Sequence, residues 1–118
     1  MSKETYSINR SIAILKPTQT FIDWANSLPD SEQKITPADL KDDCTTVLIP
    51  EYDTDKEAKE YVDSICFDLF EHELEGWCLN RDWWPKKRTK ESFWKWFAVE
   101  FHSVILDLAG DYIERQVL

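Results

Sequence analysis

The residues with the clearest chemical potential in this 118-residue chain crowd one segment, FDLFEHELEGW, at residues 67–77. Asp68 and His72 are four residues apart, and Glu75 follows three residues later. On a helix these spacings place the three side chains on one face, where carboxylates and an imidazole can bind a divalent metal ion. The alternative is a solvated acidic helix face, because such faces are common. We therefore treat Asp68, His72 and Glu75 as weak metal-ligand candidates, and we expect no metal or other cofactor.

Glu73, in the same segment, is unusual because a helical wheel places it on the apolar side of the helix. A lone carboxylate there is costly unless it is hydrogen-bonded or ion-paired. One hypothesis is a buried general acid or base in a small hydrolase or metal-dependent enzyme, with His72, Glu75 or His102 beside it. The structural alternative is a glutamate paired with Arg81, Arg88 or a tryptophan indole N–H.

The glycines and the missing nucleophile motifs narrow the catalytic options. The chain contains two glycines, Gly76 and Gly110, and each follows a predicted helix as a stop signal. No glycine-rich loop is left to cradle a phosphate, and neither G-x-S-x-G nor C-x-x-C occurs. These observations disfavour nucleotide-dependent catalysis and favour binding through side chains.

Binding chemistry is concentrated in the stretch GWCLNRDWWPKKRTKESFWKWF, which contains five of the six tryptophans. Residues 77–97 contain six basic and two acidic side chains, a local charge of +4. The whole chain has a formal charge of −9, so the remainder contributes −13. Aromatic area beside cations can contact an acidic protein, a lipid headgroup or a phosphate backbone, or can form a helix core with a solvated rim. The acidic remainder disfavours nucleic acid as the partner.

The spacing of the tryptophans predicts that they divide between core and surface. Residues that precede a proline are extended and adjacent side chains diverge, so Trp83 and Trp84 should point apart. Trp94 and Trp96 point about 200° apart on a helix, so they cannot share one core. We predict that Trp77 and Trp94 belong to the core. The predicted contact surface includes Trp83, Trp84, Lys86, Lys87, Arg88 and Trp96, and of the adjacent tryptophans at least one, Trp83 or Trp84, should be exposed.

Apolar periodicity and helix or strand breakers divide the chain into six elements that must position these residues. Two apolar runs closed by prolines predict strands, and four segments predict helices, one of them a single turn. In chain order we expect a strand over residues 11–16, a helix from Thr18 or Thr20 to Leu28, a one-turn helix over residues 37–41, a strand over residues 44–50, a long helix from Thr54 or Asp55 to Gly76, and a long helix from Thr89 to Gly110.

This order, strand, helix, short helix, strand, helix, helix, predicts an α+β fold, a two-layer α/β arrangement. A small sheet of two or three strands would be covered by three long-to-medium helices. If the two predicted strands are neighbours, we expect them to be parallel, with a right-handed crossover through the first helix. Two strands leave two open edges, so we expect either a third strand around residues 77–79 or extension of the sheet in a homodimer.

Several sequence blocks resemble those of small uncharacterised bacterial proteins. The blocks are IAILKPTQTFIDW, TVLIPE and ELEGW, followed by WPKKRTKESFWKWF. The resemblance covers nearly the whole length of the chain. It implies no activity, cofactor or catalytic residue.

Composition bounds the class of protein. The three cysteines are an odd number without paired spacing, and the segment MSKETYSINR lacks the apolar core of a signal peptide. No apolar run is long enough to span a membrane. We therefore expect a single globular domain over residues 1–118, located in the cytoplasm, without membrane contact. Our leading hypothesis is a non-enzymatic interaction domain with a protein partner or a second copy as its ligand, and the hydrolase is the alternative.

Overall fold

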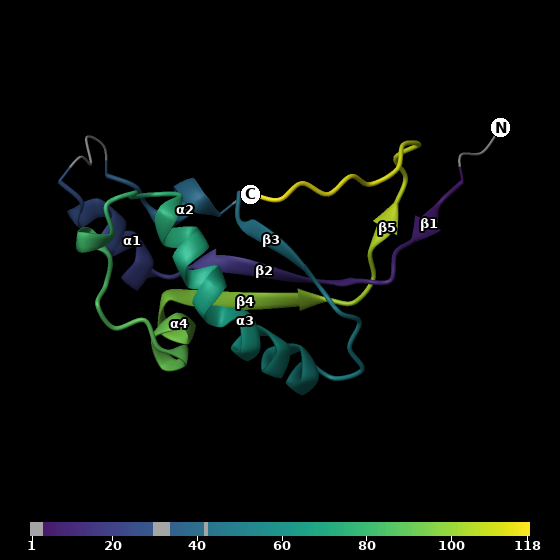
Figure 1. Cartoon of the computed structure of the whole chain (residues 1–118), viewed down its shortest axis with the longest axis horizontal. Coiled ribbons are helices and arrows are strands. Elements are labelled where there is room, and N and C mark those ends of the chain that lie inside the picture. Colours follow the sequence, from purple (N-terminus) through teal and green to yellow (C-terminus); the bar gives the residue numbers. More distant parts are fainter. Residues whose placement is uncertain (1–3, 30–33, 42) are drawn as a thin grey trace.

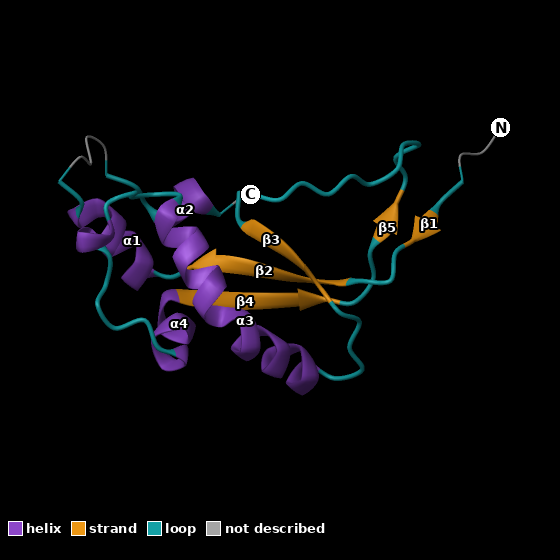
Figure 2. Cartoon of the chain, in the orientation of Figure 1, coloured by secondary structure: helices purple, strands orange, loops and turns teal. Residues whose placement is uncertain are grey.

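The computed structural model describes residues 4–29, 34–41 and 43–118 and has an α+β architecture, which confirms the predicted fold class (Figure 1, Figure 2). The predicted strands and first three helices are present, within a residue or two of the expected ends. In chain order the elements are β1 (Tyr6–Ser7), β2 (Ser11–Pro17), α1 (Gln19–Ser27), α2 (Pro37–Leu40), β3 (Thr45–Ile49), α3 (Asp55–Glu75), the 3₁₀ turn η1 (Arg81–Trp83), α4 (Lys90–Trp96), β4 (Phe97–His102) and β5 (Leu106–Asp107).

Local capping chemistry explains where the helices begin. Thr54 accepts a hydrogen bond from the Glu57 backbone N–H at 3.2 Å, which satisfies one of the free donors at the start of α3. Thr36 and Asp39 form a capping box around the single turn of α2. Thr89 accepts a hydrogen bond from the Ser92 N–H at 3.1 Å and starts α4. These side chains are local in sequence, so the helix starts were predictable.

The main sheet is antiparallel, so the predicted parallel pairing is wrong. β2 lies in the centre, with β3 on one side and β4 on the other. Leu15 pairs with Thr45 and Ser11 with Ile49, which places the start of β3 beside the end of β2. The segment between these strands, including α1 and α2, therefore returns to the same end of the sheet. No crossover to the opposite end is needed, and the right-handed crossover rule does not apply.

The predicted helix from Thr89 to Gly110 is also wrong beyond Trp96. Phe97, Val99 and Phe101 face the core, while the residues between them are exposed, which is the two-residue alternation of a strand. The Thr18 backbone N–H donates to the Trp96 carbonyl at 2.9 Å, and its hydroxyl donates to the Lys95 carbonyl at 2.7 Å. These bonds occupy carbonyl groups at the end of α4. The third strand of the sheet is therefore β4, and not a segment around residues 77–79.

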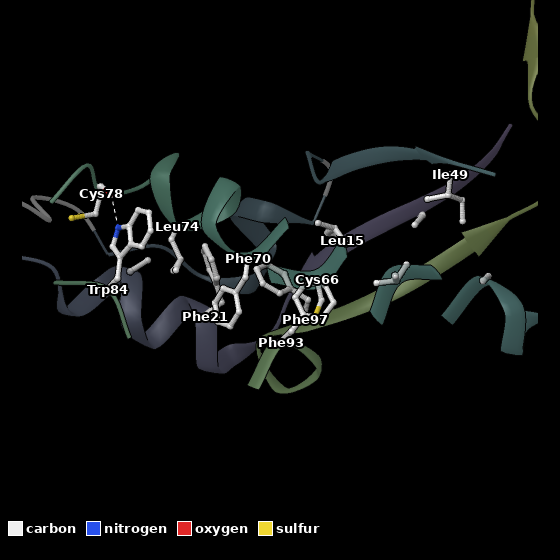
Figure 3. Packing of buried hydrophobic residues seen from close by; sticks show 14 residues of the cluster. Leu15, Phe21, Ile49, Cys66, Phe70, Leu74, Cys78, Trp84, Phe93 and Phe97 are labelled. Carbon is white, nitrogen blue, oxygen red and sulfur yellow. Dashed lines mark hydrogen bonds between the residues drawn. The ribbon is translucent and has the colours of Figure 1, made fainter. Parts of the chain in front are cut away.

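The core lies on one face of this sheet. Ser11, Ala13 and Leu15 of β2 are buried, and α3 crosses the strands on that side (Figure 1). Aromatic rings from three helices and β4 fill the space, with Phe70 and Phe93 at 6.2 Å between ring centroids (Figure 3). The fully buried large side chains of this cluster are Leu15, Phe21, Ile49, Val62, Phe70, Leu74, Phe93 and Phe97.

Beyond the helices, the chain extends into a second, smaller pairing. β1 and β5 are antiparallel, with Tyr6 opposite Asp107, and they project from one end of the molecule (Figure 1). Residues 108–118 then run back along the molecule towards β3 (Figure 1). Within the described ranges, no helix combines the length and the apolar character needed to cross a bilayer.

The two faces of the sheet should respond differently to added volume. Ala13, on the core face of β2, has no exposed surface, so Ala13→Val should lower the free energy of unfolding by about 1–3 kcal/mol. Ala98 lies on the exposed face of β4, where Ala98→Val should change it by no more than about 0.5 kcal/mol. Urea titrations followed by far-ultraviolet circular dichroism measure both values. Equal losses would contradict this assignment of faces.

Candidate functional site

Trp84 anchors the loop between α3 and α4 to the core. Its side chain is only 4% exposed, and its indole N–H donates to the Cys78 carbonyl at 2.7 Å (Figure 3). The guanidinium groups of Arg81 and Arg88 lie 4.7 and 5.7 Å from the centre of its ring, within cation–π range. The predicted place of Trp84 in an exposed surface is therefore corrected. It packs inward because the extended backbone before Pro85 turns adjacent side chains apart.

Further contacts fix this loop onto α1. The indole N–H of Trp24 donates to the Trp83 carbonyl at 2.9 Å, which joins the loop to α1 across 59 residues of sequence. The Trp77 ring meets Phe21 of α1 edge-on, with 6.1 Å between centroids. Asn80 accepts a hydrogen bond from the Asp82 N–H at 3.0 Å and shapes η1 from within. The loop is thus held at both its side chains and its backbone.

Trp96 also packs against the core, so it is only partly exposed and not the fully exposed residue predicted. It is half-buried, and its ring lies 5.3 Å from Phe70, 5.8 Å from Trp24 and 5.9 Å from Phe21. The contacts come from α1 on one side and α3 on another. Two diverging directions on α4 can therefore both be covered, which the helical wheel did not anticipate.

Trp94 packs on the other side of α4, as half-buried as Trp96. Its indole N–H donates to the Asp63 carboxylate at 2.6 Å, and Lys59 lies 5.2 Å from its ring centre. Both partners are on α3. The prediction that Trp94 belongs to the core is supported by its packing against the buried cluster.

Three large apolar side chains of the loop remain exposed: Trp77 at 40%, Leu79 at 82% and Trp83 at 39%. We call these three residues, together with the exposed Lys86 and Lys87, the loop surface. Trp77 was expected in the core, and that prediction is wrong. Leu79 was not predicted as a contact residue. Its position, as an apolar residue in a polar turn after a helix stop, could have indicated its exposure. Arg88, predicted for this surface, is half-buried against Trp84.

The acidic face of α3 is exposed, which fits the alternative of a solvated acidic helix face. Asp68, His72 and Glu75 line a shallow depression together with Glu71. Among the residues that the structure describes, no three His, Cys, Asp or Glu side chains are grouped so as to hold a metal ion. Glu71 instead lies 3.9 Å from Arg81 in an exposed ion pair.

Glu73 is half-buried, and its Oε1 atom is shielded from solvent without a hydrogen-bond partner among the described residues. The suggested partners are engaged elsewhere. Arg81 pairs with Glu71, and Arg88 donates to the Pro85 carbonyl at 2.8 Å. The sequence thus identified Glu73 as a carboxylate on the apolar side of the helix, but it did not identify the groups around it.

His102 does not approach Glu73 or His72, because it lies on the opposite side of the sheet. It is on β4, with its side chain on the face that α3 does not cover. There its Nε2 lies 3.5 Å from Glu100, which also pairs with Lys16 at 3.1 Å. Lys16 and then His102 lower the pKa of the Glu100 carboxyl. The convergence of Glu73 with His102 that a hydrolase would use is therefore not present.

Replacing Glu73 should stabilise the protein. Glu73→Leu removes the shielded, unpaired oxygen and should raise the free energy of unfolding by about 1 kcal/mol. Glu75→Leu, on the exposed face of the same helix, is the matched control and should stay within about 0.5 kcal/mol of wild type. Urea denaturation gives both values. A clear loss of stability in Glu73→Leu would show that Glu73 has a stabilising partner.

The adjacent tryptophans of the loop should differ sharply on truncation. Trp84→Ala should lower the free energy of unfolding by about 3–5 kcal/mol, because it empties a core position and removes the bond to Cys78. Trp83→Ala should cost about 1 kcal/mol or less, since the bond from Trp24 uses a backbone carbonyl that the variant keeps. The same urea assay measures both. Similar losses of stability in the two variants would contradict the assignment of Trp84 to the core and Trp83 to the surface.

Comparison of the chain with protein-family models, with curated proteins and with solved structures gives no match in any of the three. The sequence blocks noted above therefore assign no family. What the protein does has to be argued from its own exposed residues and their support.

Proposed function

We propose that the chain is a non-enzymatic, cytoplasmic protein-interaction domain whose contact site is the loop surface. One observation carries the proposal: Trp77, Leu79 and Trp83 are exposed within seven residues of a loop that the rest of the fold holds in place. Trp77 and Trp83 are partly packed inward, yet 40% and 39% of their surface stays exposed, and Leu79 is 82% exposed. Exposed apolar groups gathered in this way are typical of interaction sites.

The support beneath these side chains favours tight binding. Association costs free energy when loops and side chains must be ordered. Here the Trp83 backbone is already bonded to Trp24, and Trp77 already packs on Phe21. A partner would gain the burial of two indole rings without ordering the loop. Tryptophan is enriched among the residues that contribute most to protein interfaces for this reason.

The charge around the loop surface indicates an acidic partner. Lys86 and Lys87 are exposed, and residues 77–97 carry +4 in a chain of −9. Complementary charge speeds association and excludes partners of the wrong sign. The remaining −13 would repel an extended phosphate backbone, so a protein segment whose acidic side chains reach only the lysines fits better. The proposed cytoplasmic setting agrees with buried Cys66 and Cys78 thiols that form no disulfide.

Substitutions on the loop surface should remove binding without unfolding the domain. As baits in pull-down experiments from the native host, a Leu79→Ser and Trp83→Ala double variant should lose the partner that the wild type retains. The charge-reversed Lys86→Glu and Lys87→Glu double variant should retain less of it, most clearly at low salt. The matched control is Phe67→Ser, an exposed aromatic on α3 that should bind like wild type.

Mass spectrometry of the eluted proteins and circular dichroism of each bait complete this test. The same partners eluted from all baits, with folded spectra, would contradict the proposed surface. Loss of the folded spectrum in Trp83→Ala would show that this residue supports the core.

A further inference from the structure

Residues 103–118, which we call the arm, leave an unusual amount of apolar surface uncovered. Every large apolar side chain of the arm except Ile105 is half or more exposed. Beyond β5, residues 110–118 make no hydrogen bond or ion pair with another described residue. Exposed apolar side chains are unfavourable in water, so burying them against another surface would lower the free energy. The exposed residues are Val104, Leu106, Leu108, Tyr112, Ile113, Val117 and Leu118.

The molecule is more elongated than a compact chain of its length. The radius of gyration is 16.5 Å, whereas a compact chain of this length has a value of about 13–14 Å. The longest dimension is 54 Å, against 31 and 28 Å for the others. The excess length comes from the β1–β5 ribbon, and the arm that follows it runs back along the molecule (Figure 1). A two-stranded ribbon alone is marginally stable, so this one lacks a covering surface.

A matching uncovered surface exists on the same chain. The face of the main sheet that α3 does not cover presents Ile12 and Ile14 of β2 and Leu48 of β3. On β4, His102 pairs with Ile12 and Glu100 with Ile14, so polar side chains border the apolar ones on that side. Ile12 pairs with Leu48 across the strands, so the apolar side chains adjoin one another. Leu48 is half exposed although β2 flanks it. We call this surface the outer sheet face.

We propose that the arm of one chain docks on the outer sheet face of a second copy, and that the exchange is reciprocal. Each chain carries one arm and one face, so a two-fold axis satisfies both at once. A fully exposed large apolar side chain offers of the order of 100 Å². The seven side chains of the arm are between half and fully exposed, so together they offer roughly 500 Å² of the roughly 800 Å² that each partner buries in a standard stable interface. The arm alone therefore supplies most of the area that a dimer needs.

Geometry favours a second copy over the chain's own arm. Within one chain the arm passes along the edge of β3 and along α3, since Arg115 lines a shallow depression with Leu48 and Tyr61, and Leu118 lines another with Asp68 and His72. Its apolar side chains nevertheless remain exposed in that position. The same segment approaching from another molecule is free to place them on the isoleucines.

Sedimentation velocity tests the dimer directly. Wild type should sediment with twice the 14.0 kDa mass of one chain at micromolar concentration. An Ile113→Glu and Val117→Glu variant of the arm, and separately Leu48→Glu on the face, should raise the dissociation constant at least tenfold. Phe67→Glu, an equally exposed aromatic on α3, is the control and should dimerise like wild type. Wild type at 14.0 kDa up to 100-fold higher concentration would overturn the proposal.

Mixing the two classes of variant tests which surfaces meet. A mixed dimer retains one unmodified arm on one unmodified face, so mixing should restore part of the dimer that neither variant forms alone. No recovery on mixing would overturn the seating of the arm on the face. Monomeric wild type whose arm is protected from proteolysis would show instead that the arm covers its own chain.

Salt separates this inference from the proposed function of the loop surface. Two chains of −9 repel each other, so the apolar dimer should tighten as salt rises, whereas an acidic partner on the loop surface should bind more weakly. The Leu79→Ser and Trp83→Ala variant should remain dimeric. A dimer lost in that variant and retained in the arm variant would place the self-contact on the loop and overturn the arm proposal.

Discussion

The end of α4 at Trp96 is the constraint on which the rest of the structure depends. Carbonyl groups at the end of a helix need donors, and Thr18 supplies two of them, from its backbone N–H to Trp96 and from its hydroxyl to Lys95. This contact joins the corner between β2 and α1 to the corner between α4 and β4. With the helix stopped there, Phe97 begins a strand that pairs with β2. The sheet gains its third strand, and the Phe70, Phe93 and Phe97 rings meet behind it.

The same corner decides which tryptophans remain available for binding. Because α4 lies between α1 and α3, both Trp94 and Trp96 find partners within the fold and are half-buried. The loop before α4 must then cross from α3 to Thr89, and Trp84 fixes it to the core on the way. Only the side chains on the outer side of that loop stay exposed. The contacts that pack this loop against the core therefore also hold the loop surface in a fixed position.

The two proposed contact surfaces lie at different places and differ in chemistry. The loop surface is near one end of the long axis, and the β1–β5 ribbon projects from the other (Figure 1). The first combines indole rings with lysines, so it suits an acidic partner. The second is an apolar arm with little charge, and it suits the apolar face of a second copy. A dimer of this kind would leave its loop surfaces for other proteins.

Sequence alone determined the elements whose signals are local. Prolines ended both main strands, Thr54 and Thr89 began helices, and Glu73 was identified as a carboxylate on an apolar side. Tertiary structure decided the rest. The spacing of Phe93, Phe97 and Phe101 fits a helix, while Phe97, Val99 and Phe101 fit a strand, and only the pairing with β2 chooses between them. Strand direction and tryptophan exposure likewise depend on contacts between distant residues, whose free energies exceed any local preference of the chain.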